Sequence, residues 1–136
     1  MQDEIIQNKM DSIKKCLNRV REVYGQAPDN FLTDYTLQDV VVLNLQRAVQ
    51  ATIDLASHIV RVKGLRLPKE SKEVFISLFE GKIISEKMQN NMIAMVGFRN
   101  IAVHEYKKLD MNVVKKIIQS HLGDFESFLI EILNAD

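Results

Sequence analysis

The feature that most constrains the fold of this chain is a helical repeat of apolar residues along most of its length. Apolar side chains recur at steps of three and four residues from Gln2 to Tyr24, from Thr36 to Val62, and again through the last third of the sequence. This period places them on one face of an α-helix. Alternating Val- and Thr-rich segments, Asn-Gly hairpin turns and a glycine-rich phosphate loop do not occur. The sequence therefore predicts an all-α protein.

Capping and turn residues divide the pattern into an up-and-down bundle of four long helices and one short helix. Gly25 and the following Pro28-Asp29-Asn30 turn are expected to end the first helix. Thr36, Ser85 and Asp110 are the expected N-caps of the second, fourth and last helices. The expected helices cover residues 2–24, 36–62 and 71–79, then begin again at 85 and at 110, the last one running to the end of the sequence.

Length and composition fit one small domain. A chain of 136 residues can bury a real core, and we expect residues 1–136 to form a single helical domain. No apolar run reaches membrane-spanning length, so no membrane partner is expected. The N-terminus lacks the features of a secretory signal, and Cys16, the one cysteine, cannot form an internal disulfide. These features favour a cytoplasmic location.

The charge balance argues against binding of nucleic acid by overall charge. Lys plus Arg and Asp plus Glu both number 18, so the formal net charge is zero. Two segments can supply a local basic surface. Residues Arg61–Lys72 carry five basic side chains against one acid, and residues Lys107–Lys116 carry four against one. The alternative is that these side chains are ordinary solvated helix ends and loops.

One stretch of the fourth expected helix gathers residues that suit chemistry on a phosphodiester. It reads Gly-Phe-Arg-Asn-Ile-Ala-Val-His-Glu-Tyr from Gly97 to Tyr106. The planar guanidinium of Arg99 can hold phosphate oxygens, and His104 can take and return a proton near neutral pH. Together they would allow an RNA 2′-hydroxyl to be deprotonated and to attack its neighbouring phosphate. This chemistry needs no metal or other cofactor.

This stretch resembles the Arg-polar-x-x-x-His motif of the HEPN superfamily, with Arg99, Asn100 and His104 in the three defined places. The longer Arg-x4-His-x-Tyr form, ending at Tyr106, is similar to that of the HepT toxin branch. The resemblance implies a HEPN-like, dimeric, metal-independent endoribonuclease toxin of a type VII-like toxin–antitoxin pair. It also implies a cognate partner, a minimal nucleotidyltransferase antitoxin, that adenylylates the tyrosine. The expected catalytic residues are then Arg99, Asn100 and His104, and the expected modification site is Tyr106.

Helix geometry favours a site shared between two copies of the chain. At about 100° per residue, Arg99 and His104 point about 140° apart on an ideal helix, whereas Arg99 and Tyr106 nearly coincide. Either the helix bends or ends near His104, or Arg99 of one copy approaches His104 of the other. HEPN proteins are known for the second arrangement, a cleft at the two-fold interface of a homodimer. The residues that we expect to line such a cleft are Asp54, Glu105 and Lys107.

Plainer interpretations of these residues also exist. Asp54 and His58, four apart on one helix, can form a metal pair, but no third ligand stands at a recognisable spacing, which favours a hydrogen-bonded pair. Arg99 and His104 can be interface residues that form ion pairs with Glu86 or Glu105. His121 falls in the apolar pattern of the last helix and is expected in the core or at an interface.

Two other functions compete with the endoribonuclease. One is a non-catalytic HEPN subunit that binds nucleotide or a nucleotidyltransferase partner through the same surface. The other is a helical dimerisation module in which the motif is only structural. RNA cleavage that persists in chelator and is lost in His104→Ala would separate the nuclease from the non-catalytic subunit.

Overall fold

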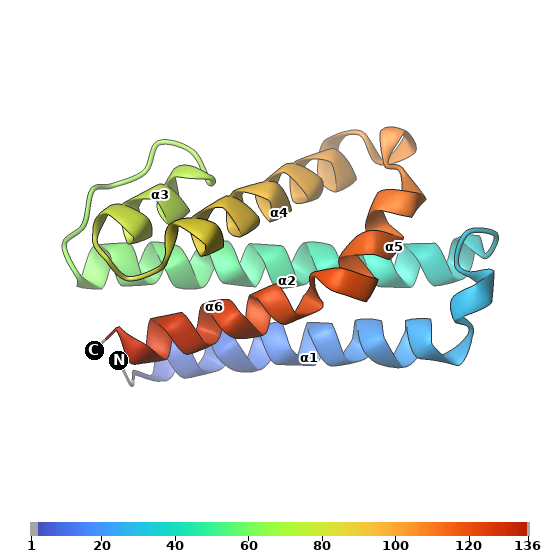
Figure 1. The fold of residues 1–136 in the computed structure, drawn as a ribbon, viewed down its shortest axis with the longest axis horizontal. Coiled ribbons are helices and arrows are strands. Elements are labelled where there is room, and N and C mark those ends of the chain that lie inside the picture. The colour runs from blue at the N-terminus through green and yellow to red at the C-terminus, as the bar shows by residue number, and fades with distance from the viewer. Residues whose placement is uncertain (1–2, 136) are drawn as a thin grey trace.

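The structure, a computed structural model, describes residues 3–135 and is all-α, as predicted (Figure 1). Within these residues there is no strand, and no helix is both long enough and apolar enough to cross a membrane. Two short 3-10 turns, η1 and η2, separate some of the α-helices. The elements in chain order are α1 (Glu4–Gln26), η1 (Pro28–Asn30), α2 (Tyr35–Val62), α3 (Glu73–Glu80), α4 (Glu86–His104), η2 (Tyr106–Lys108), α5 (Met111–Ser120) and α6 (Leu122–Asn134).

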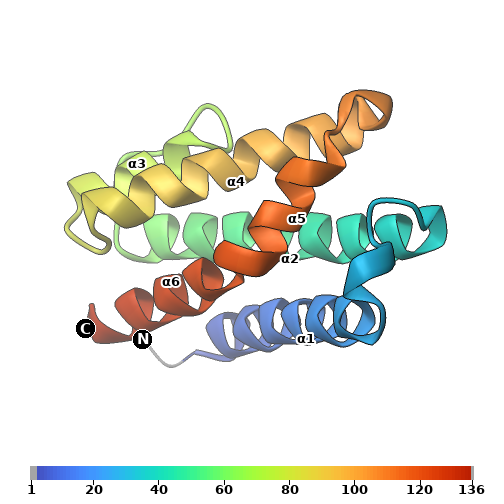
Figure 2. The same cartoon turned by 45° about the vertical axis from the view of Figure 1, so that its right-hand side comes forward.

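The helices α1, α2, α4 and α6 form a bundle in which each packs against the next (Figures 1 and 2). The apolar side chains of all six helices meet in one continuous core. Leu17 of α1, Leu45 of α2 and Phe128 of α6 are almost fully enclosed. Three methionines of α4, Met88, Met92 and Met95, also face inward, and Met92 is completely buried. The predicted apolar faces therefore provide the contacts that hold α4 in place.

The first helix continues past the glycine that was expected to end it. Gly25 lies inside α1, which runs on to Gln26. Ala27 ends the helix, with φ −153° and ψ 62°. Ala27 precedes Pro28, and the proline ring disfavours a helical conformation in the residue before it. Proline rather than glycine therefore sets this boundary.

The second helix begins one residue earlier than predicted because a different residue caps it. The Asp34 carboxylate accepts a hydrogen bond from the backbone N–H of Leu37 at 3.1 Å. Thr36, the predicted cap, lies within the first turn of the helix. The predicted end at Val62 is confirmed, and Gly64 beyond it has φ +66°, a conformation that favours glycine.

The third helix begins at Glu73, two residues after the predicted start at Ser71. The Glu73 carboxylate accepts hydrogen bonds from the backbone N–H groups of Lys69, at 2.7 Å, and Glu70, at 2.9 Å. These bonds hold the preceding residues in a turn. The turn places the end of the basic segment beside α4.

The last predicted helix is divided in two. α5 ends at Ser120 and α6 begins at Leu122, because His121 has a non-helical backbone with φ −127° and ψ −1°. The His121 Nδ1 atom lies 2.9 Å from Oδ2 of Asp124 in the first turn of α6. The His121 side chain is 41% exposed, so it does not lie in the core of one chain, and its alternative place at an interface stays a prediction. Figure 2 shows α5 crossing from the end of α4 towards α6.

Candidate active site at the end of helix α4

The motif lies on the last turns of α4 and on the 3-10 turn that follows. The helix starts where predicted, with Ser85 Oγ accepting a hydrogen bond from the backbone N–H of Met88 at 3.1 Å. It ends at His104, because Glu105 leaves the helical region with φ −143° and ψ 51°. Tyr106 therefore stands on η2, outside the helix.

Arg99 points from α4 to the middle of α2. Its Nη1 donates a hydrogen bond to Oε1 of Gln50 at 3.0 Å. Gln50 Nε2 in turn donates to Oδ1 of Asp54 at 2.9 Å, and Asp54 Oδ2 lies 3.4 Å from Nζ of Lys9 on α1. The Nε atom of Arg99 is buried and has no hydrogen-bond partner among residues 3–135. A network of polar contacts across α4, α2 and α1 thus fixes the position of the Arg99 Nη1 atom.

Arg99 and Asn100 border a shallow hollow of about 300 Å³. The turn before α3 supplies its other wall, with Ser71 and Lys72 among the lining residues. The structure thereby brings one end of the basic segment Arg61–Lys72 next to the motif arginine. The charged and polar lining consists of two basic groups, Arg99 and Lys72, one acid, Glu70, and the neutral Ser71 and Asn100, and Lys72 Nζ lies 3.8 Å from Oε2 of Glu70. Because the basic groups outnumber the acid, the hollow can bind a phosphate.

His104 and Arg99 do not converge within one chain. His104 is exposed at the last helical position, while Arg99 is half-buried against α2. The helix is regular through both residues, so they keep the angle of about 140° expected from helix geometry. Asn100, four residues before His104, is exposed on the same side of α4. A single chain thus presents the motif residues on two different faces.

Arg99 and Tyr106 do not point in nearly the same direction, contrary to the prediction from ideal helix geometry, because α4 ends between them. The Tyr106 hydroxyl donates a hydrogen bond of 2.6 Å to Oδ1 of Asp39, near the start of α2. Asp39 and Gln50, the two partners on α2, are eleven residues apart, which corresponds to about 16 Å along a helix. Within one chain, Tyr106 and Arg99 therefore contact separate parts of α2.

Tyr106 is 39% exposed, so the expected modification site is partly accessible to solvent. Burial, followed by the hydrogen bond and the negative charge of Asp39, raises the pKa of the Tyr106 phenol to about 12. The Tyr24 ring packs edge-on against Phe31. Tyr35 is 76% exposed at the start of α2.

The three residues expected to line a cleft have different surroundings. Asp54 joins the Arg99 network through Gln50. Glu105 Oε2 pairs with Nζ of Lys108 at 2.8 Å, and Lys107 is exposed. Of these three, Asp54 is thus the one that is linked to the motif arginine by side-chain hydrogen bonds.

One of the plainer interpretations is wrong for the contact that it specifies. His58 Nε2 lies 2.9 Å from Oδ2 of Asp3, so the predicted Asp54–His58 pair does not form. Within one chain Arg99 bonds to Gln50 rather than to an acid, and ion pairs of Arg99 or His104 across an interface stay a prediction. Among the described residues, no three or more His, Cys, Asp and Glu side chains gather in a way that fits a metal ion.

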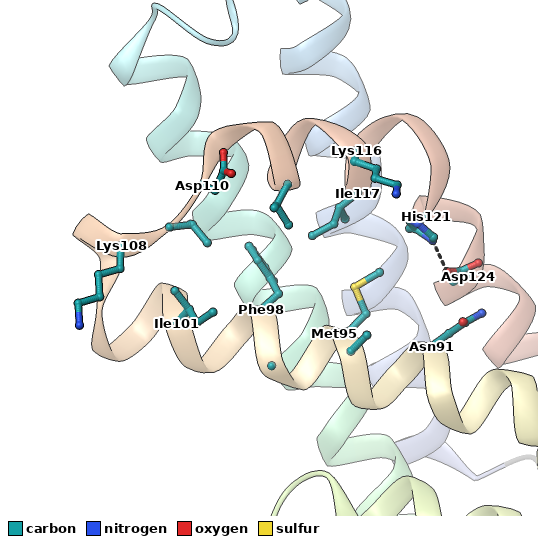
Figure 3. A pocket seen from close by; sticks show the side chains of 14 residues that line it. Asn91, Met95, Phe98, Ile101, Lys108, Asp110, Lys116, Ile117, His121 and Asp124 are labelled. Atoms are coloured by element: carbon teal, nitrogen blue, oxygen red, sulfur yellow. Dashed lines mark hydrogen bonds and ion pairs between the residues drawn. The ribbon is translucent and has the colours of Figure 1, made fainter.

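A second, more apolar groove of about 500 Å³ lies between α4 and α5 (Figure 3). Figure 3 shows Met95, Phe98 and Ile117 between these helices, with the His121–Asp124 pair at one end. Arg99, Asn100 and His104 are absent from its lining. The groove is therefore separate from the motif residues.

Sequence reasoning missed Gln50 as a partner of Arg99 and Asp39 as a partner of Tyr106. In the sequence, the place of Asp39 near the start of a helix is explained by the favourable interaction of a carboxylate with the helix dipole. Gln50 stands four residues before Asp54, a spacing that indicates only a surface pair. Neither residue carries a signal of its contact with α4 or η2.

Comparison with known proteins identifies the family. The family model described as "Ribonuclease HepT-like" matches residues 13–132. The chain is 43% identical over 134 residues to the mRNA nuclease HepT of Shewanella oneidensis, covering 98% of this chain and 99% of that protein. It is 26% identical over 128 residues to the tRNA nuclease HepT of Aphanizomenon flos-aquae, covering 94% of this chain and 87% of that protein.

A solved structure supports the same assignment. The tri-AMPylated HEPN toxin of Shewanella oneidensis, in complex with MNT antitoxin, matches this fold with a TM-score of 0.93 and 43% identity. The match covers 98% of this chain and 99% of that chain. As the motif ending at Tyr106 predicted, this chain belongs to the ribonuclease HepT-like family.

Proposed function

We propose that this protein is an endoribonuclease toxin that cleaves RNA without a metal ion. The observation that carries the proposal is the position of the motif, in a chain of this family, on an open surface at the end of α4. Arg99 and Asn100 border a polar hollow there, and His104 is exposed to solvent. Two relatives are named mRNA nuclease and tRNA nuclease, which supports RNA as the substrate class. We place the activity in the cytoplasm, where such substrates occur.

His104 acts as general base and its protonated form as general acid. The neutral imidazole takes the proton of a ribose 2′-hydroxyl, whose oxygen attacks the adjacent phosphorus. The bond from phosphorus to the 5′-oxygen then breaks, and an imidazolium returns a proton to that oxygen. The products carry a 2′,3′-cyclic phosphate and a 5′-hydroxyl.

Arg99 stabilises the negative charge that develops on the non-bridging phosphate oxygens. Its Nη1 is held by Gln50, which fixes the plane of the guanidinium and leaves the N–H groups other than that of the buried Nε for phosphate. Lys72, across the hollow, supports binding of the RNA backbone. Asn100 orients either the phosphate or the imidazole from the same side of α4 as His104.

The complete site requires a homodimer. One chain turns Arg99 and His104 in different directions, and a two-fold axis near the end of α4 would set Arg99 of one protomer against His104 of its partner. Ile101, Val103 and Val113 are exposed apolar side chains near this end of the molecule. Their burial between two protomers would stabilise the pair.

A nucleotidyltransferase antitoxin is the proposed regulatory partner. The related toxin from Shewanella oneidensis is AMPylated and forms a complex with MNT antitoxin. Here the acceptor is Tyr106, whose hydroxyl is partly exposed on η2. Tyr106 and Arg99 of one chain contact distant parts of α2. An adenylate on Tyr106 is therefore expected to block the site that contains the partner's Arg99.

Loss of the base tests the catalytic proposal. Cleavage of RNA by His104→Ala should fall on the order of 10²–10⁴-fold while activity of the wild-type protein persists in chelator. Arg99→Lys should also cleave poorly, because an ammonium cannot reproduce the planar fork. His121→Asn, a histidine change at the α5–α6 junction, is the matched control. A fully active His104→Ala protein, or strict dependence on added magnesium, would overturn the mechanism.

A further inference from the structure

The closest polar contact of Tyr106 is to a carboxylate of another helix. The Tyr106 hydroxyl lies 2.6 Å from Oδ1 of Asp39, which is 67 residues away in the sequence. Hydrogen bonds of a hydroxyl to an ionised carboxylate fall at about 2.5–2.7 Å, and neutral hydroxyl bonds are longer. Asp39 therefore already accepts a hydrogen bond from the proton that must leave if the phenol oxygen acts as a nucleophile.

We propose that Asp39 is the catalytic base for transfer of adenylate to Tyr106. This inference rests on the proposed modification of Tyr106 by a nucleotidyltransferase partner. The partner supplies ATP, and the phenol oxygen attacks its α-phosphorus. The new bond joins this oxygen to the α-phosphorus, the bond from the α-phosphorus to the bridging oxygen breaks, and pyrophosphate leaves. The phenol proton passes to the Asp39 carboxylate and from there to water.

The surroundings of the phenol explain why it needs a base. With its pKa raised to about 12, the Tyr106 hydroxyl is almost entirely protonated at neutral pH and is a weak nucleophile. Glu105, the acid next to Tyr106 in the sequence, forms an ion pair with Lys108 at 2.8 Å. Asp39 is the carboxylate that contacts the hydroxyl directly.

The same geometry predicts what happens after transfer. The modified oxygen has no proton to donate, and its phosphodiester carries a negative charge. Beside the Asp39 carboxylate this charge is repelled. The modified side chain should therefore leave α2 and turn towards the open side of η2. In that position the adenylate is free to enter the cleft between protomers.

Adenylate transfer to purified variants tests the role of Asp39. The wild-type chain, Asp39→Asn and Asp39→Glu are incubated with the partner nucleotidyltransferase and ATP, and the Tyr106 peptide is followed by mass spectrometry. Asp39→Asn can still accept the hydrogen bond but cannot take the proton, so the initial rate should fall on the order of 10²–10⁴-fold. Asp39→Glu should keep much of the rate. Asp29→Asn, the same change in η1, is the control and should match the wild-type rate.

A more acidic phenol separates proton transfer from positioning. A fluorinated tyrosine inserted at position 106 ionises more easily and depends less on a base. It should restore part of the rate lost in Asp39→Asn, which a purely positioning role would not allow. Unchanged transfer in Asp39→Asn would show that the partner supplies the base and would overturn the inference alone. An Asp39→Asn defect without rescue would also overturn it.

Absence of any adenylate on wild-type Tyr106 has a different meaning. It would overturn the proposed modification and, with it, the role of Asp39. The ribonuclease proposal would be unaffected, since the His104→Ala comparison tests it separately.

Discussion

Replacing Gln50 by alanine tests whether α2 positions the motif arginine. Gln50 holds Nη1 of Arg99 at 3.0 Å and is itself tied to Asp54. A hydrogen bond to a charged group contributes about 1.5–3 kcal/mol, and the lower end applies to this exposed pair. Since about 1.4 kcal/mol corresponds to a factor of ten, Gln50→Ala should lower kcat/KM for RNA cleavage roughly tenfold.

The comparison needs two reference variants. Gln46→Ala removes the same side chain one turn earlier on α2 and should leave kcat/KM within about twofold of wild type, the range expected for a substitution away from the site. Arg99→Ala removes the guanidinium itself and should cost on the order of 10²–10³-fold, as loss of a transition-state donor does. Helicity measured by circular dichroism checks that all variants fold. Wild-type activity in Gln50→Ala would refute the positioning role, and a loss equal to that of Arg99→Ala would mean that Gln50 contacts RNA.

Three further predictions concern the tyrosine and the basic hollow. The pKa of Tyr106 is raised from 10 to about 12 in the folded state, so the stability that this group contributes below pH 10 should be lost as pH rises from 10 to 12. Thermal melts of wild type and Asp39→Asn across this range should show a smaller loss of stability in the variant, and equal losses would contradict this. Tyr106→Phe should keep RNA cleavage but escape silencing by adenylylation, and silencing without partner binding would contradict the assignment. Lys72→Ala should raise KM for RNA several-fold and weaken its salt dependence, whereas Lys87→Ala should not; identical KM values in both would exclude Lys72 from the binding surface.

Helix positions could be predicted well where a local residue sets the boundary. Ser85 and Asp110 cap their helices as predicted, because a side-chain oxygen satisfies a free N–H of the first turn. The break at His121 was not predicted, since one non-helical residue barely changes the spacing of the apolar residues around it. Glycine disfavours a helix interior, yet Gly123 lies inside α6 and the break falls two residues before it.

The candidate site was predictable only as a set of residues. The spacing of Arg99, His104 and Tyr106 indicated the motif, but the direction of Tyr106 depended on where α4 ends. Helix geometry alone placed Tyr106 beside Arg99, and the change of backbone at Glu105 removes this overlap. Contacts of these residues with α2 span 49 residues for Arg99 and 67 for Tyr106. A single sequence holds no local signal for contacts between helices so far apart.

The central claim, an active site built from two protomers, is tested most directly with a mixed dimer. Arg99→Ala and His104→Ala chains, each with a different affinity tag, are co-expressed and purified through both tags. If Arg99 of one protomer works with His104 of its partner, the mixed dimer keeps one intact site of two. It should then cleave RNA at about half the wild-type rate, although each variant alone is inactive. A mixed dimer as inactive as its parents would show that both residues must come from one chain and would contradict the account.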